Sequence, residues 1–202
     1  MALLSAVWAA GQPQQSHLQT PVNNPPDQSY QGITGQQRFE WFVKSTVGPQ
    51  SLAAGIFSSA IATAENRPVE YGPHWEGFGK RYGMRLSGLA TNHAMEAGLG
   101  ALWQEDPRYF RADDQALQGR LRHIVVMTFA ARRADGHLAP AYARLIAMPA
   151  GNFLSNTWRA DSVATNDAAL QRTMWGFLGR MAGNAFAEFW PDVKKHIFHK
   201  TN

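Results

Sequence analysis

The sequence predicts an all-α protein: a compact bundle of five or six helices with close small-residue packing, preceded by a disordered linker. Apolar residues recur at helical spacing in long segments that Gly and Pro separate, and no convincing strand pattern occurs between them. Several segments also carry small residues four positions apart, a spacing that lets two helices approach closely. Together, the two patterns predict helices that pack on one another through Gly and Ala.

Composition divides the 202-residue chain into three parts. Residues 1–10 are apolar and carry small residues, as a signal peptide does, but no basic residue precedes them, which indicates a truncated signal; the frayed N-terminus of a cytosolic protein is the alternative. Residues 11–37 are rich in Gln, Pro and Asn and cannot bury enough apolar surface to fold, which predicts a disordered linker. Residues 38–202 form the helical domain.

Breaks in the sequence set the limits of the helices. Gly48 and Pro49 separate the first two helices, and Pro107 cannot continue the central one. A kink is expected at Pro149, and Pro191 introduces a basic C-terminal end. The expected helices cover residues 38–47, 51–65, 82–103, 117–133, 138–158 and 168–190.

Charge and composition exclude several classes of function. The formal charge is +4, the fourteen Arg and five Lys residues are dispersed, and no nucleic-acid motif accompanies them, so no nucleic-acid partner is expected. The absence of Cys excludes disulfides, thiolate metal ligands and a catalytic thiol. No phosphate-binding loop, dinucleotide fingerprint or GxSxG motif is present.

The central helix carries a polar stripe. At 3.6 residues per turn, Arg85, Asn92 and Glu96 fall within about 40° of one another. Two later helices repeat the pattern: each presents an Arg followed by Asn, and then a carboxylate or amide, beside a pair of small residues. Because such groups are costly to bury singly, we expect them to satisfy one another across helix interfaces. The predicted network is Arg85, Asn92, Arg144, Asn152, Asn156, Arg180 and Asn184, with the carboxylates Glu96 and Glu188.

A functional alternative uses the same residues. If the polar faces enclose a cavity, Glu96 and Glu188 could act as general acid and base or as metal ligands, with His93 one turn from Glu96. The order His-x-x-Glu reverses that of di-metal carboxylate sites, and the last helix offers no matching His. We therefore expect no metal and no cofactor, and we favour structural pairing, because buried charges are more often paired than catalytic.

Three stretches carry a resemblance. RFEWFVKSTVGPQSL, LWQEDPRYFR and AEFWPDVKKHIF resemble segments of an uncharacterised family of exported bacterial proteins, which are built of a signal peptide, a polar linker and a Gly/Ala-rich helical domain. The resemblance covers residues 38–202 and implies export and a helical fold. It implies no activity, so no functional residue is carried over from it, and the truncated signal departs from the family pattern.

The expected function is that of a non-catalytic protein of the cell envelope, structural or membrane-associated, in the periplasm or at the outer membrane. Low charge, a run without charge over residues 45–64 and Trp residues at helix ends favour contact with a membrane interface. The expected partners are membrane lipid or envelope proteins, and the small-residue faces also allow a homo-oligomer. The alternative is an enzyme or a small-molecule or metal-binding protein with a polar cavity around Glu96 and Glu188.

Overall fold

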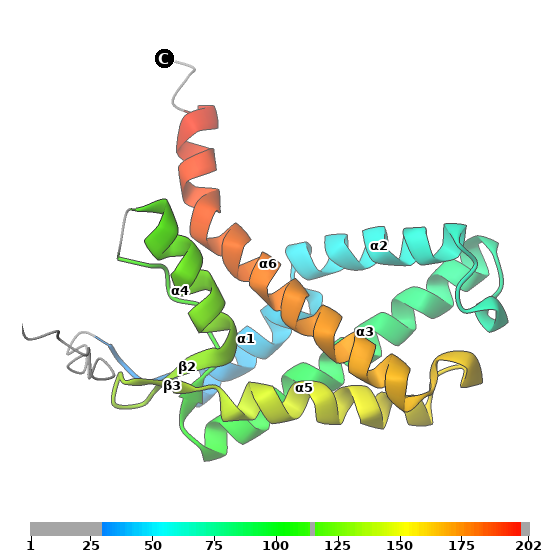
Figure 1. Cartoon of the computed structure of the whole chain (residues 1–202), viewed down its shortest axis with the longest axis horizontal. Coiled ribbons are helices and arrows are strands. Elements are labelled where there is room, and N and C mark those ends of the chain that lie inside the picture. The colour runs from blue at the N-terminus through cyan, green and yellow to red at the C-terminus, as the bar shows by residue number, and fades with distance from the viewer. Residues whose placement is uncertain (1–29, 114–115, 199–202) are drawn as a thin grey trace, which may run out of the picture.

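Six α-helices and a small three-stranded sheet form the part of the chain that the computed structural model describes, residues 30–113 and 116–198 (Figure 1). The predicted all-α class is confirmed, and the expected signal peptide and residues 11–29 of the expected linker lie outside the described residues. The helices are α1 (Gly35–Val47), α2 (Pro49–Ala64), α3 (His74–Leu102), α4 (Leu117–Phe129), α5 (Tyr142–Leu154) and α6 (Asn166–Phe198). The strands are β1 (Glu105–Asp106), β2 (Ala130–Arg133) and β3 (Leu138–Pro140).

The folded part begins earlier in the chain than composition predicts. Thr34 caps α1 in a capping box: its hydroxyl oxygen accepts from the Gln37 backbone N–H at 3.2 Å, and the Gln37 side chain accepts from the Thr34 N–H at 3.0 Å. The Tyr30 hydroxyl donates to Asp106 Oδ2 at 2.8 Å. Residues 30–37 are therefore anchored to the helical domain.

Helix α3 is the element on which the others are arranged. It packs against α1, α2 and α5, while α6 crosses the molecule and packs on α4 and α5 (Figure 1). The turn that links α2 to α3 is held by Arg81, whose guanidinium donates to the carbonyl oxygens of Arg67, Pro68 and Gly72. This arrangement leaves a space between α6 and the pair formed by α2 and α3.

The sheet is absent from the sequence prediction. The sequence assigns residues 130–133 and 138–140 to two helices, but they form an antiparallel hairpin, and Asp106 of β1 pairs with Arg132 of β2. The turn of this hairpin contains Asp135 and Gly136, with Gly136 at φ +83°. Because the pairing with β1 joins residues far apart in sequence, helical periodicity in α4 and α5 gives no sign of it.

Helix α6 continues beyond Pro191, where the sequence predicts a boundary. Proline removes one backbone hydrogen-bond donor from the helix. Arg120 of α4 nevertheless bonds to residues of α6 on both sides of Pro191. Its guanidinium donates to the Glu188 carbonyl oxygen at 2.7 Å and to Asp192 Oδ2 at 2.6 Å. The last turns of α6 extend past α4 toward the C-terminus (Figure 1).

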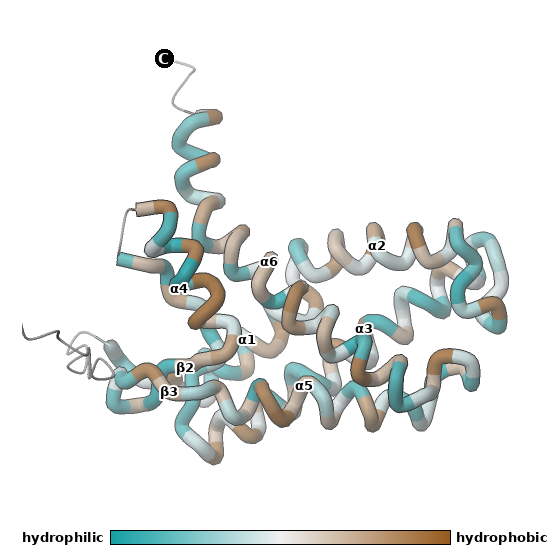
Figure 2. Tube along the Cα trace, viewed as in Figure 1, coloured by the Kyte–Doolittle hydropathy of each residue, from teal (hydrophilic) through white to brown (hydrophobic). Residues whose placement is uncertain are grey.

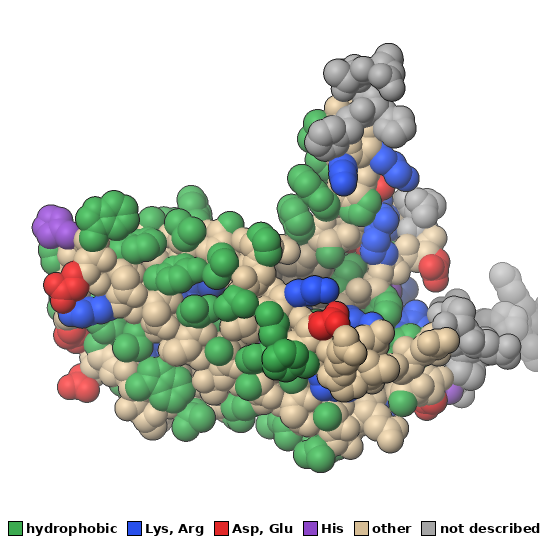
Figure 3. Space-filling model, turned by 180° about the vertical axis from the view of Figure 1, so that it is seen from behind, with side chains coloured by type: hydrophobic (Ala, Val, Ile, Leu, Met, Phe, Trp, Pro, Cys, Tyr) green, Lys and Arg blue, Asp and Glu red, His purple; other side chains and the backbone are tan. Residues whose placement is uncertain are grey.

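The distribution of polarity is inverted relative to an ordinary globular core. Among the described residues fourteen polar or charged side chains are buried, against seven apolar ones, five of which are Ala. Large apolar side chains are instead exposed on every helix. Figure 2 shows hydrophobic residues alternating with hydrophilic ones along the helices, and Figure 3 shows hydrophobic side chains across one face of the molecule. Phe57 of α2 is 69% exposed and Trp175 of α6 is 66% exposed. Among the described residues, no helix has both the length and the hydropathy that crossing a bilayer requires.

Small residues have two different roles in the packing. Gly151 of α5 lies against Asn92 of α3, as a small residue at a helix crossing does, whereas Gly98 meets open space, and so do Gly179 and Gly183 of α6. Other glycines make room for guanidinium groups. These pairs are Gly55 with Arg85, Gly88 with Arg159 and Gly100 with Arg38. A Cβ added at each of these glycines would lie 2.7–2.9 Å from the nearest guanidinium nitrogen.

The crossing of α3 and α5 gives the first testable prediction. A Cβ at residue 151 would overlap Asn92 Oδ1, so Gly151→Ala should lower the free energy of unfolding by about 1–3 kcal/mol. Gly98→Ala is the matched control within a helix, and it should raise stability by roughly 0.5–1 kcal/mol because nothing opposes the new methyl group. Urea denaturation measures both changes, and equal effects at the two sites would contradict the packing described.

Candidate functional site

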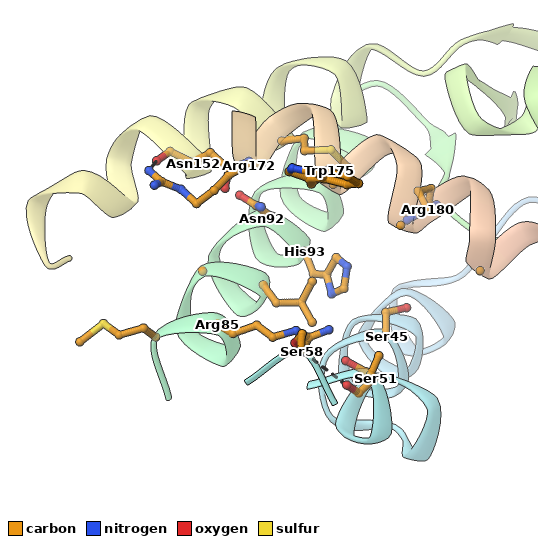
Figure 4. A pocket seen from close by; sticks show the side chains of 18 of the residues that line it. Ser45, Ser51, Ser58, Arg85, Asn92, His93, Asn152, Arg172, Trp175 and Arg180 are labelled. Carbon is orange, nitrogen blue, oxygen red and sulfur yellow. Dashed lines mark hydrogen bonds between the residues drawn. The ribbon is translucent and has the colours of Figure 1, made fainter. Parts of the chain in front are cut away.

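A cavity of about 880 Å³ lies between α6 and the α2–α3 pair. Residues from α1, α2, α3, α5 and α6 line it, and Figure 4 shows Arg85, His93 and Arg180 among the side chains around it. The lining is strongly cationic: it contains seven Lys or Arg residues and one acidic residue, Glu96. The chemistry of the cavity therefore depends on how this single carboxylate is engaged.

Glu96 is shared by two arginines. Arg144 Nε donates to Glu96 Oε1 at 2.8 Å, and Arg180 approaches the same carboxylate at 3.4–3.5 Å. Burial raises the pKa of Glu96, but the charges of Arg180 and Arg144 outweigh this effect and hold the pKa below its ordinary value. A carboxylate so engaged is a weak proton acceptor, which disfavours a role as general base.

Arg144 is the most extensively bonded of these side chains and is 1% exposed. Its Nη1 donates to the carbonyl oxygens of Met127 and Thr128, each at 2.9 Å, and its Nη2 reaches that of Pro107 at 3.4 Å. The last carbonyl oxygens of a helix have no hydrogen-bond donor within that helix. At the end of α4, the Arg144 guanidinium provides these donors. Arg144 thus joins α5, α3 and the end of α4.

His93 lies between α1 and α3 beside this group. A hydrogen bond joins its Nδ1 to Thr46 Oγ1 at 3.1 Å, and the Trp41 ring lies 5.3 Å away between centroids. Burial is the main cause that lowers the pKa of His93; Glu96 opposes it, Arg180, Arg85 and Arg144 add to it, and the pKa falls to about 4. His93 is therefore neutral at pH 7, and among the described residues no three His, Asp or Glu side chains form a metal site.

Glu188 belongs to a separate cluster and does not line the cavity. It is fully buried and accepts from the Tyr109 hydroxyl at 2.8 Å, from the Ala112 N–H at 3.1 Å and from Arg120 Nε at 2.7 Å. Burial raises its pKa, but these donors more than offset that and lower it. Because Glu96 and Glu188 do not face a common space, the structure does not bring them together as an acid and base pair.

Three other members of the predicted network are paired in other ways, whereas Asn92 Oδ1 is buried without a hydrogen-bond partner among the described residues. Asn152 donates to Thr173 Oγ1 at 3.1 Å, and Asn184 donates to Thr128 Oγ1 at 3.2 Å. Asn156 accepts from Arg172 and donates to the Thr165 carbonyl oxygen at 3.2 Å. Among the described residues, the hydrogen bonds that join two members of the predicted network are those from Arg144 and Arg180 to Glu96. The other partners are hydroxyls, carbonyls and arginines that lack the repeated spacing.

Most arginines in the cavity lack a carboxylate partner. Among the described residues, five of the six have no Asp or Glu oxygen within 4.0 Å: Arg67, Arg81, Arg85, Arg159 and Arg172. Burial lowers the pKa of Arg85, Arg159 and Arg172. The sequence pattern predicts only Arg85 of these five, because the others lie outside the repeated Arg–Asn–Glu spacing.

Comparisons with models of known protein families, with curated proteins and with solved structures find no match to this chain. Function is therefore inferred from the cavity and the surface. Within the described residues the cavity presents mainly hydrogen-bond donors, and its one carboxylate is already neutralised. Such a set of groups suits binding rather than acid–base chemistry.

Removing the Glu96 charge should strongly destabilise the fold. Glu96→Gln leaves Arg144 and Arg180 buried without a carboxylate, so the free energy of unfolding should fall by roughly 3–5 kcal/mol. Glu76→Gln, at an exposed pair with Lys80 on the same helix, is the control and should leave the melting temperature unchanged. If Glu96→Gln melts at the wild-type temperature, the carboxylate does not hold these helices together.

His93 should make stability depend on pH. In the unfolded chain it gains a proton near pH 6.5, whereas in the fold it does so only near pH 4, so the unfolded state binds more protons between these values. Stability should therefore fall as pH decreases from 6.5 to 4, by up to about 3 kcal/mol. Denaturant melts across this range measure the slope, and His93→Gln should flatten it; an unchanged slope would assign the effect to other groups.

Proposed function

We propose that this chain is a non-catalytic protein of the cell envelope that associates with membrane lipid through its apolar outer faces. The observation that carries this proposal is the inverted distribution of polarity, with charged groups inside and large apolar groups outside. Water solvates such a surface poorly, and exposed apolar area of this extent marks an interaction surface. Export, as the sequence resemblance implies, is part of the proposal.

Lipid suits this surface better than a single protein partner does. A protein partner covers one patch, but the exposed apolar side chains are distributed over all six α-helices of the described residues. Hydrophobic side chains also spread across the face seen in Figure 3, with few charged groups between them. A lipid interface can contact several such faces at once, and the formal charge of +4 favours anionic lipid.

Helix α2 offers the clearest contact surface. It carries no charged residue, and Ile56, Phe57 and Ile61 are each about half exposed or more. Because they are spaced at i, i+1 and i+5, these three side chains lie on one side of the helix. Gly55 and Ser59 lie on the other side, which is buried. A helix of this kind can lie with its apolar side among lipid headgroups and acyl chains.

Vesicle binding tests the proposal. The full chain should sediment with vesicles of phosphatidylcholine, and more strongly when phosphatidylglycerol is added. Phe57→Asp places a charge on the apolar side of α2 and should weaken binding by about tenfold or more without lowering the melting temperature, because Phe57 is exposed in the free protein.

The matched control adds the same charge at a polar position. Gln36→Asp lies at the exposed N-terminus of α1, where a negative charge is tolerated, and should bind vesicles nearly as the wild type does. If the wild-type chain stays in the supernatant with both kinds of vesicle and runs as a compact monomer without detergent, the proposal is wrong.

A further inference from the structure

We propose that the C-terminal arm of α6, residues 186–197, binds the surface of a bilayer that contains anionic lipid. The proposal rests on the proposed function, to which it adds the segment that enters the lipid interface and the class of headgroup that this segment selects. In the arm, one side of the helix packs on α4, the opposite side carries an apolar stripe, and two lysines lie near the end.

The apolar stripe consists of Phe186, Trp190, Val193 and Ile197, which are 44–58% exposed. These residues are spaced at i, i+4, i+7 and i+11, so at 100° per residue they fall within about 60° of one another on one side of the helix. The rings of Phe186 and Trp190 are stacked, with 5.0 Å between their centroids. The stripe is therefore a continuous apolar surface along the arm rather than a set of isolated side chains.

Helix α4 holds the arm on the side away from the stripe. Arg120 Nε donates to Glu188 Oε1 at 2.7 Å, and Arg120 Nη2 donates to Asp192 Oδ2 at 2.6 Å. Glu188 lies roughly opposite the stripe around the helix axis, so the contact with α4 leaves the stripe exposed. The end of the arm projects past α4 in Figure 1, and hydrophobic side chains follow one edge of this projecting part in Figure 3.

The charges of the arm that lack an ionic partner are positive. Its two acidic residues, Glu188 and Asp192, are both paired with Arg120. Lys194 and Lys195 are exposed, and among the described residues neither has a carboxylate oxygen within 4.0 Å. At 100° per residue Lys194 lies at the border of the stripe, so its stem can pack beside the apolar side chains while its ammonium group reaches a headgroup phosphate.

A bilayer fits the stripe better than a second copy of the chain does. A stable protein interface uses about 20–30 residues on each side, whereas the stripe offers four large side chains over about three helical turns. The arm of a second copy would also bring two more lysines and no unpaired carboxylate. An anionic lipid surface supplies both an apolar phase and the opposite charge, and Trp190 belongs to a residue type that is enriched at such interfaces.

Sedimentation of the full chain with vesicles tests the arm. Ile197→Asp places a charge at the distal end of the stripe and should weaken binding to mixed phosphatidylcholine and phosphatidylglycerol vesicles by about tenfold or more. The melting temperature should not change, because Ile197 is exposed in the free protein. Leu170→Asp is the matched control: it makes a similar change at a residue of α6 that is 51% exposed and lies outside the arm, and it should bind nearly as the wild type does.

The two lysines should determine the choice of lipid. Lys194→Gln combined with Lys195→Gln should lower the affinity for vesicles that contain phosphatidylglycerol by about tenfold or more, and should leave binding to pure phosphatidylcholine unchanged. Lys44→Gln combined with Lys80→Gln removes the same charge from exposed pairs on α1 and α3 and should keep the preference for anionic vesicles. Equal loss of this preference in both double variants would assign it to net charge and overturn the inference.

The outcomes separate this inference from the proposed function. If the wild type binds neither kind of vesicle, the proposed function fails, and the inference fails with it. If the wild type binds vesicles and Ile197→Asp binds them equally well, only the inference is overturned. Light scattering after gel filtration tests the second copy: a wild-type dimer that Ile197→Asp converts to a monomer, with vesicle binding unchanged, would assign the stripe to self-association and also overturn the inference.

Discussion

The contact between Arg144 and Glu96 is the interaction on which the rest of the structure depends. Glu96 belongs to α3, Arg144 to α5 and Arg180 to α6, so one carboxylate draws three helices together. Arg144 Nη1 donates to the carbonyl oxygens of Met127 and Thr128 at the end of α4, where the chain continues into β2. The small side chains of Ala131, Ala141 and Ala143 line a small space together with Glu96 and Arg144, and they supply little hydrophobic stabilisation, so the geometry of the ion pair fixes how the helices cross.

The buried polar side chains and the exposed apolar side chains of this protein have one cause. Charges that occupy the interior of a helical bundle displace the large apolar groups that normally fill it, and those groups then lie on the outer faces. The cationic cavity and the apolar surface are consequently linked.

Several glycines have a different structural role from the one that their spacing predicts. Pairs four residues apart predict close contacts between helix backbones, and Gly151 against Asn92 approaches that situation. Gly55, Gly88 and Gly100 instead accept arginine side chains, which need a gap where a methyl group would stand. A helix with few side chains can thus bury long cationic ones, and the spacing of the glycines alone does not distinguish the two uses.

Local patterns in the sequence determined the helices of this protein, the abundance of small residues and the presence of Arg144, Glu96 and Arg180 on polar faces. These features follow from helical periodicity, which acts over a few turns. Tertiary structure alone decided that Glu96 pairs with two arginines while Glu188 joins Tyr109 and Arg120 elsewhere. It also decided the sheet, the continuation of α6 through Pro191 and the gathering of Arg159 with Arg172. Each of these depends on how helices cross, and contacts between residues far apart in sequence leave no periodic trace.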